Sequence, residues 1–251
     1  MLKIWSYRGT ALIIVLLVLG YESLTDITKR LDPLLFPGLS KIVPTLWNQF
    51  GHLNHNLLSS LKLLAPAYAV ALVLGVAIGL IVGWSEPLRR NLTPIFRGLS
   101  PIPPTMYIPY TIAVLPTFWS ASFFIISLGC FWPILMGTIH GVTIIEQRHI
   151  DNARMLNLKG LRFLRRVVLP AATPSIFSGA GISLVFSFIL LMVAEMFGAN
   201  SGLGYFIQQQ ADFSEYDKVL AGLIYMSVFI IAVMVIFDLI QRRALHWLEK
   251  R

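Results

Sequence analysis

A series of apolar stretches, each about as long as a membrane-spanning helix, constrains this chain most. A helix needs roughly 20 apolar residues to cross a bilayer. We predict six spans along the 251 residues, at about 9–24, 62–84, 98–115, 117–142, 174–196 and 219–240. The composition agrees, since 56% of residues are hydrophobic and only 13% are charged. Soluble domains carry about 25% charged residues. We therefore predict an all-α, polytopic membrane protein with about six transmembrane helices, forming a single transmembrane domain over residues 1–251.

Two of these stretches are unusual. The first resembles a signal peptide, because Lys3 and Arg8 precede it, but no good cleavage site follows. We interpret it as an uncleaved anchor. The third, 98–115, contains four prolines, including Pro103 and Pro109. Prolines remove backbone donors, so such a helix survives in lipid only where neighbouring helices or a cavity satisfy the freed carbonyls. We expect it in the interior, and Pro103 and Pro109 are candidate residues of a translocation path.

The positive charges fix a topology. With the N-terminus inside, the inside segments hold fifteen of the twenty lysines and arginines. This is the distribution of cytoplasmic loops, so we predict that both termini lie in the cytoplasm of a bacterial inner membrane. The net charge of +8 then reflects topology and not nucleic-acid binding. The long loop 143–173 lies inside, and the segment 25–61, with apolar residues at helical spacing, is predicted to lie outside as an amphipathic interfacial helix.

Small residues recur at helical spacing. Gly75, Gly79 and Gly83 share one face of the second span. Such residues let another helix approach closely in lipid, so we predict a packing role for all three. Cys130 is the single cysteine and is expected to be a buried hydrophobe. His, Cys and acidic residues do not cluster in the sequence, which favours no metal site.

The inside loop carries the most specific motif. Residues 146–170 read EQRHIDNARMLNLKGLRFLRRVVLP. The run Asp151-Asn152-Ala153, three residues, Asn157, nine residues and Val167-Val168-Leu169-Pro170 resembles the EAA loop of ABC importer permeases. That motif is Glu-Ala-Ala, three residues, Gly, nine residues, Ile-x-Leu-Pro. Asn157 replaces the glycine of the turn, and Asn is the other residue that tolerates left-handed backbone angles, so the turn can survive.

Two further stretches are similar to the nitrate, sulfonate, taurine and bicarbonate branch of these permeases. The proline-rich stretch 99–109 resembles the branch pattern R-x-I-P-x-x-A-x-I-P. The stretch 194–205, AEMFGANSGLGY, resembles AEM-x-G-A-x-S-GLG-Y. Together the similarity covers roughly residues 57–245. The chain departs from the branch at 115–120, where LPTFWS replaces a turn that usually contains Trp/Phe-Phe-Gly and an acidic residue.

The resemblance implies a type I ABC importer permease. Such a subunit forms the path for a small solute, and a separate ABC ATPase hydrolyses ATP. The chain has no G-x-x-x-x-G-K-[ST] segment, so we expect no enzyme activity and no cofactor of its own, with ATP bound by the partner. A second copy, in a homodimer, and an extracellular or periplasmic solute-binding protein are the other implied partners. The implied ATPase-coupling residues are Asp151, Asn152, Ala153, Arg154, Leu156, Asn157, Val167, Leu169 and Pro170.

Glu195, near the outer end of the fifth span, has two interpretations. An ionisable group inside the membrane is a functional candidate, here for the path or a gate. Because the outside loop is only a residue or two away, the carboxylate could instead be hydrated at the headgroup level. The sequence alone leaves both open.

Other functions fit the sequence less well. A membrane-embedded protease needs a serine–histidine pair or two aspartates within the spans, and that constellation is missing. A secondary transporter usually shows inverted repeats and mid-membrane charges, and neither is evident. Within the importer class, the substrate is a small solute such as a sulfonate, nitrate, taurine or bicarbonate. A vitamin precursor or another small organic molecule is the alternative, and a permease that has drifted from active transport remains open.

Overall fold

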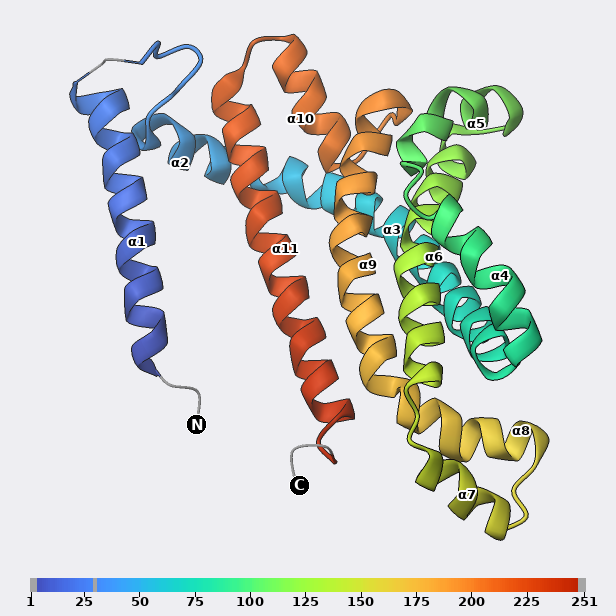
Figure 1. The fold of residues 1–251 in the computed structure, drawn as a ribbon. Helices are drawn as coiled ribbons and strands as arrows, with labels where there is room; N and C mark the ends of the chain where they lie inside the picture. Colours follow the sequence, from blue (N-terminus) through green and yellow to red (C-terminus); the bar gives the residue numbers. More distant parts are fainter. Residues whose placement is uncertain (1–3, 29–30, 248–251) are drawn as a thin grey trace.

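The computed structural model describes residues 4–28 and 31–247, which form helices joined by short links (Figure 1). The α-helices are α1 (Ile4–Glu22), α2 (Leu39–Asn48), α3 (Phe50–Trp84), α4 (Glu86–Leu99), α5 (Ile108–Val114), α6 (Phe118–Thr143), α7 (Gln147–Met155), α8 (Gly160–Phe163), α9 (Leu169–Gly198), α10 (Leu203–Asp212) and α11 (Tyr216–Ala244). A 3₁₀ turn covers Pro104–Tyr107, and π-helical turns cover Ser23–Ile27 and Leu164–Val168. No strand occurs in the described part of the chain.

Four helical stretches are long and apolar enough to cross a membrane: Phe50–Trp84, Phe118–Thr143, Gly160–Gly198 and Tyr216–Ala244. They correspond to the second, fourth, fifth and sixth predicted spans. The helix α1 corresponds to the first, and its apolar centre, residues 12–19, is exposed. The helix α3 begins earlier than predicted, at Phe50, and runs obliquely across the molecule (Figure 1).

The prediction of a continuous third span over 98–115 is wrong. The chain leaves α4 at Leu99, passes through a non-helical link and a 3₁₀ turn, and re-forms a helix at Ile108. Proline cannot donate the helical hydrogen bond, and it drives the preceding residue toward extended angles. Pro103 accordingly has extended angles, φ −60° and ψ 124°. The helix α4 ends before this break, and the short helix α5 follows it (Figure 1).

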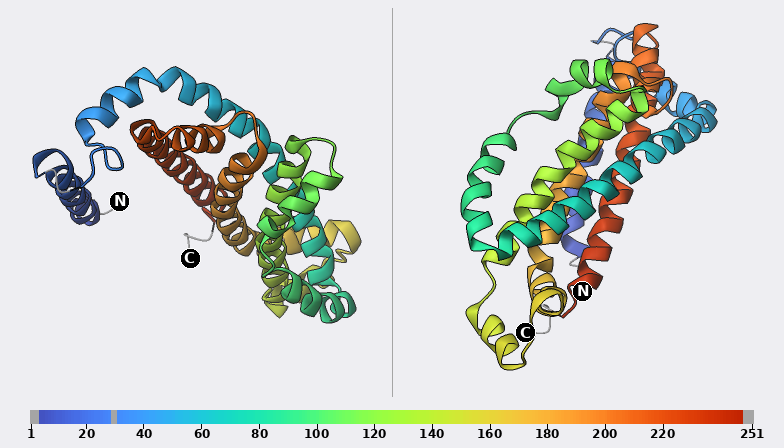
Figure 2. Two further views of the ribbon diagram at one scale, coloured as in Figure 1. Left: turned by 90° about the horizontal axis from the view of Figure 1, so that it is seen from above. Right: turned by 90° about the vertical axis from the view of Figure 1, so that its right-hand side faces the viewer.

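The core is formed by α3, α6 and α9, with α6 between the other two (Figure 2). Glycines set this packing. A Cβ on Gly75, Gly79 or Gly83 of α3 would lie 2.8, 2.6 or 2.8 Å from Ile134, Thr138 or Val142 of α6. On the side toward α9, a Cβ on Gly137 would lie 3.0 Å from the Gly179 Cα atom. The backbones therefore approach as closely as small residues allow in lipid.

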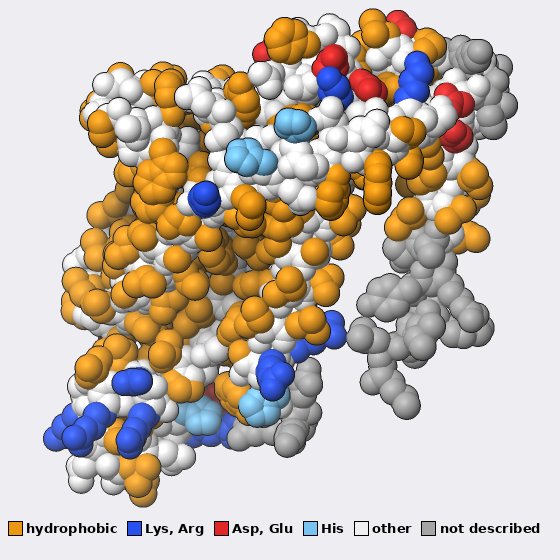
Figure 3. Space-filling model, turned by 180° about the vertical axis from the view of Figure 1, so that it is seen from behind, with side chains coloured by type: hydrophobic (Ala, Val, Ile, Leu, Met, Phe, Trp, Pro, Cys, Tyr) orange, Lys and Arg blue, Asp and Glu red, His pale blue; other side chains and the backbone are white. Residues whose placement is uncertain are grey.

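The two ends of the bundle differ in charge. Figure 3 shows an apolar middle, with most lysines and arginines at the end that carries α7 and α8 and most acidic side chains at the other. We call these the basic end and the acidic end. The helices α2, α5 and α10 lie at the acidic end (Figure 1). The first described turn of α1 and the last turns of α11 lie toward the basic end, as the predicted topology requires.

The helix α1 stands apart from the bundle in both Figure 1 and Figure 2. Its link to the rest is a set of hydrogen bonds at the acidic end, where Tyr21 donates to the Pro37 carbonyl at 2.8 Å and Glu22 accepts from the Leu39 N–H at 3.1 Å. The predicted amphipathic segment 25–61 contains α2, whose Ile42 is buried. The hydroxyl of Thr45 on α2 donates to Asp217 at the start of α11, at 3.0 Å.

Candidate functional site

The loop at the basic end, which contains α7 and α8, is buried on one side and exposed on the other. Ala153 of α7 is 3% exposed and belongs to a cluster with Phe163, Val168, Leu80, Val142 and Ala172. Three hydrophobic side chains at the tip are far more exposed: Met155 at 82%, Leu156 at 73% and Leu161 at 78%. The loop therefore has a buried base and an apolar tip, which is typical of a surface that another protein covers.

The turn after α7 depends on Asn157. This residue has φ 53°, in the left-handed region. The Leu158 N–H donates to the Ala153 carbonyl at 3.0 Å, which closes the helix end in the way glycine-terminated helices usually close. The sequence-based expectation that asparagine preserves this turn is thus confirmed.

The loop returns to the membrane through a continuous helical stretch. The helix α8 passes into α9 through the π-helical turn Leu164–Val168, so that the two helices meet at an angle (Figure 1). Leu169 and Pro170 are the first two residues of α9. Pro170 has no N–H to donate to the preceding turn, and the π-helical turn lies just before it. These two residues lie where the chain changes direction.

Aromatic packing connects the loop to the bundle. The ring centroids of Phe163 in α8 and Trp84 at the end of α3 are 4.7 Å apart. The same apolar cluster holds Leu80 of α3, Val142 of α6 and Ala172 of α9. The loop therefore packs against all three core helices.

Several predicted coupling residues meet in one groove. Asn152, Ala153, Leu156, Val167 and Pro170 line a groove of about 570 Å³. Asp151 lies on the exposed side of α7, where the Gln147 side-chain amide donates to it at 3.0 Å. The side chain of Arg154 lies outside the described residues.

Glu195 lies at the acidic end of α9 and is 2% exposed. Its carboxylate accepts a hydrogen bond from the Gly204 N–H at 2.8 Å. The Ser60 hydroxyl of α3 is within hydrogen-bonding reach of the same carboxylate. The interpretation of Glu195 as a hydrated group at the headgroup level is therefore wrong, because the chain folds back over it.

The glycines of the SGLG segment make this closure possible. Gly202 has φ 124°, and a Cβ there would lie 2.3 Å from the Glu195 carboxyl carbon. A Cβ on Gly204 would lie 2.9 Å from the Glu195 Cβ. Both positions need a residue without a side chain, because the backbone wraps directly around the carboxylate.

Polar residues on α3 hold the same turn, and the sequence analysis missed them. Asn56 accepts from the Gly202 N–H at 3.0 Å, and Ser60 accepts from the Leu203 N–H at 2.9 Å. Ser59 and Ser201 share a hydrogen bond of 2.6 Å. The sequence does contain a pattern that indicates these residues: Asn56 and Ser60 are four residues apart, so they share one face of α3.

Glu195 also lines a cavity of about 420 Å³. Thr117, Phe118 and Trp119 line the same cavity. They belong to the segment that departs from the branch, and Thr117 forms a capping box with Ser120 at the start of α6. Residues shared with the branch and residues that differ from it thus face one another across this space.

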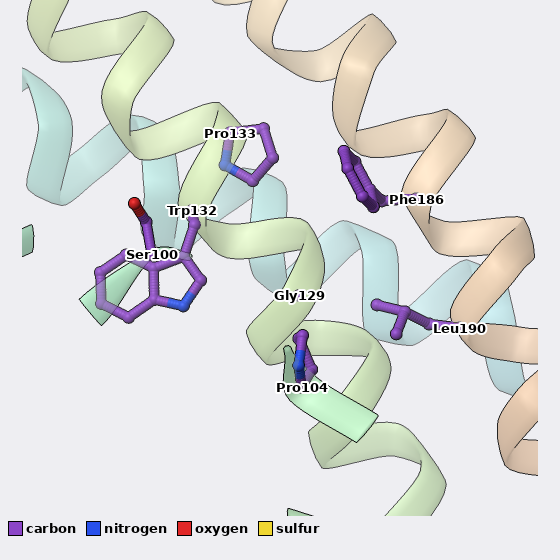
Figure 4. Close-up of a pocket in the computed structure, with 7 residues that line it drawn as sticks. All are labelled: Ser100, Pro104, Gly129, Trp132, Pro133, Phe186 and Leu190. Atoms are coloured by element: carbon purple, nitrogen blue, oxygen red, sulfur yellow. The ribbon is translucent and has the colours of Figure 1, made fainter. Parts of the chain in front are cut away.

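A second cavity, of about 230 Å³, lies under the break between α4 and α5 (Figure 4). Its lining is uncharged and comes from the link after α4, the 3₁₀ turn, α6 and α9; it consists of Ser100, Pro104, Gly129, Trp132, Pro133, Phe186 and Leu190. Pro103 and Pro109, the predicted path residues, are exposed and lie elsewhere. Of the four prolines in 98–115, Pro104 lines this cavity.

Sequence comparison decides the family. Residues 66–246 match the family of binding-protein-dependent transport system inner membrane components. The chain belongs to this family. It is therefore a multi-pass membrane protein of a family of permease subunits, which are not enzymes.

Curated relatives fall in the branch that the motifs indicated. The nitrate import permease NrtB of Leptolyngbya laminosa is 32% identical over 68% of this chain and 61% of its own length. The putative aliphatic sulfonates permease SsuC of Bacillus subtilis is 30% identical over 79% of this chain and 70% of its own length. The taurine permease TauC of Escherichia coli is 30% identical over 81% of this chain and 71% of its own length. The chain thus spans about three fifths of the length of that nitrate permease.

Solved structures agree on the fold. A chain of the inward-facing MetNI methionine ABC transporter aligns with a TM-score of 0.66, covering 82% of this chain and 97% of its own length. The sequence identity is 18%, so this likeness concerns the fold alone. The prediction of an importer permease fold is confirmed.

Proposed function

We propose that this chain is the membrane permease subunit of an ATP-driven importer and that the α7–α8 loop couples it to a separate ATPase. One observation carries the proposal. The loop exposes Met155 and Leu156, while its base is buried against three core helices. An exposed apolar tip on a rigid base suits a partner that must grip the loop and move it.

The membrane orientation follows from the same assignment. The ATPase is cytoplasmic, so the basic end faces the cytoplasm, in accord with the positive-inside distribution. Both termini then lie on the cytoplasmic side of a bacterial inner membrane. The acidic end faces outward, where α2 and α10 are the surface on which a solute-binding protein would dock.

A second copy of the chain would complete the path. The helix α1 stands apart from the bundle (Figure 2), and its apolar centre, residues 12–19, is exposed, which suits contact with lipid or with a second copy. We propose a homodimer with two ATPase subunits. The chain itself would hold no cofactor, and ATP would be bound and hydrolysed by the partner.

The solute is proposed to be small. The relatives are named for nitrate, bicarbonate, sulfonates and taurine, which supports an oxyanion or a sulfonate. A neutral organic molecule is the second candidate. The observation that favours it is the uncharged, aromatic lining of the cavity in Figure 4.

Co-purification tests the proposal. The tagged chain is extracted gently from its native membrane, and the bound proteins are identified by mass spectrometry. We expect an ATPase with a phosphate-binding loop in the wild type and its loss in Leu156→Glu. The matched control is Phe213→Glu, which changes a residue that is 70% exposed at the acidic end and should retain the ATPase. Absence of any ATPase from the wild type would defeat the proposal.

A further inference from the structure

A basic groove lies between α4 and α6 at the basic end, and none of its lining residues belongs to α7 or α8. It has a volume of about 580 Å³, and Arg89, Arg90, Arg97 and His140 line it. Glu86 is the single acidic residue in that lining. Three arginines against one carboxylate give the groove a net positive charge.

The helix α4 arranges these groups on one face. Arg90, Thr93 and Arg97 follow one another at spacings of three and four residues, so their side chains project from the same side. The adjacent face carries Leu92 and Phe96, which pack against Trp132 and neighbouring residues of α6. The polar face is thus held in place by an apolar one.

The arginines of the groove do not all have partners. Arg89 donates to the Gly83 carbonyl at 2.9 Å and so caps the carboxyl end of α3. Within the described residues, Arg90 and Arg97 make neither an ion pair nor a hydrogen bond, and both are exposed. Two guanidinium groups therefore remain available to a ligand in a groove that already exists.

The unpaired hydroxyl of Thr93 is a second observation that supports a ligand in this groove. Among the described residues, the Thr93 hydroxyl is the buried side-chain polar group that has no hydrogen-bond partner. Such groups are rare and call for an explanation, because an unmet hydroxyl costs free energy. Thr93 lines the same groove as the two free arginines.

We propose that this groove binds an oxyanion group, of the phosphate or sulfonate type. Planar guanidinium groups match the geometry of such oxygens and form charge-assisted hydrogen bonds with them. Basic pockets between membrane helices, at the end where arginines gather, bind anionic headgroups. The same chemistry also suits a free anion, so the ligand comes either from a lipid headgroup or from solution. The inference does not depend on transport.

Two binding measurements separate the sources. Native mass spectrometry of the full chain in detergent compares phosphatidylglycerol with phosphatidylcholine of identical tails. Equilibrium dialysis measures the binding of labelled inorganic phosphate. Preferential retention of phosphatidylglycerol without phosphate binding assigns the site to a headgroup, whereas phosphate binding assigns it to a free anion. Equal retention of the two lipids together with no phosphate binding overturns the proposal.

Variants locate the site. Arg90→Gln combined with Arg97→Gln should lower anion retention by roughly thirtyfold, because two charges near the headgroup are lost and each contributes about fivefold. The matched control, Arg242→Gln with Arg243→Gln, removes two exposed charges at the same end on α11 and should change retention less than twofold. Thr93→Val should weaken retention without lowering the unfolding temperature, since its hydroxyl makes no bond within the described chain. Equal losses in the two arginine pairs would show diffuse charge attraction only and would overturn the assignment to this groove.

Discussion

Each end of the bundle carries a motif that resembles one of the permease family, and the two motifs differ in how much of them is buried within the chain. At the acidic end, the turn 199–204 closes over Glu195, and its N–H groups are met by Glu195, Asn56 and Ser60. At the basic end, the α7–α8 loop buries its base and exposes Leu156 and its neighbours. The first motif has its hydrogen bonds met within the chain, whereas the second leaves apolar side chains exposed, as the proposed contact with an ATPase requires. Substitutions at the acidic end should therefore act on stability, and those at the loop tip on association.

The largest effect on stability is expected from Gly202→Ala. The new Cβ would lie 2.3 Å from the Glu195 carboxyl carbon, on a backbone with φ 124°. Strain and overpacking together should cost about 3 to 5 kcal/mol. Thermal unfolding in detergent measures this cost. Gly98→Ala is the control, because a Cβ there would meet no atom within 4 Å. A Gly202→Ala protein as stable as the control would refute the closure around Glu195.

A smaller loss is expected from Phe163→Ala. This side chain is 6% exposed and packs on Trp84, so its removal leaves a cavity under the loop. We expect a loss of about 3 kcal/mol in local stability, which limited proteolysis of the 147–168 region would detect. Solute uptake should fall while the ATPase still co-purifies. The matched control is Phe124→Ala on α6, whose side chain is 46% exposed and lies outside the loop. Normal uptake by Phe163→Ala would contradict the mechanical link.

The turn at Asn157 should show a graded effect. Asn157→Val places a β-branched residue at φ 53° and should cost about 1 to 2 kcal/mol, whereas Asn157→Gly should be neutral or slightly stabilising. Hydrogen exchange of α7 amides compares the two variants. Equal protection in both would mean that the left-handed turn is not maintained in the membrane.

The smallest effect on stability is expected from Leu156→Glu. Because Leu156 is 73% exposed, its substitution should change the free energy of unfolding by less than about 0.5 kcal/mol. Binding of the ATPase should nevertheless be lost. Paired measurements of unfolding temperature and co-purification separate the two properties. A variant that loses stability and retains the ATPase would reverse the comparison between the two ends.

Much of this architecture follows from local patterns in the sequence. The spacing of Gly75, Gly79 and Gly83 identified one face of α3, and the structure puts that face against α6. The loop was recognised because its motif has a fixed spacing, and the special backbone angle at Asn157 follows from the residue type. These features depend on residues close together in the chain.

Features that depend on distant contacts were harder to predict. The hydropathy of 98–115 suggested a span, but prolines overrode it by removing the donors that a continuous helix needs. The burial of Glu195 depends on Asn56 and Ser60, more than 130 residues earlier, which cover it only after α3 and α9 pack together. The cavities likewise arise from helix packing, so the sequence alone does not show which proline of 98–115 lines one of them.

Cross-linking in the native membrane tests the central claim most directly. Cys130 is fully buried, so a photoactivatable maleimide would label an added Met155→Cys selectively. The account predicts that Met155→Cys forms an adduct with an ATPase, identified from its peptides, and that Phe213→Cys at the acidic end does not. Failure of Met155→Cys to reach an ATPase, or equal adducts from both positions, would contradict the assignment of the α7–α8 loop as the coupling element.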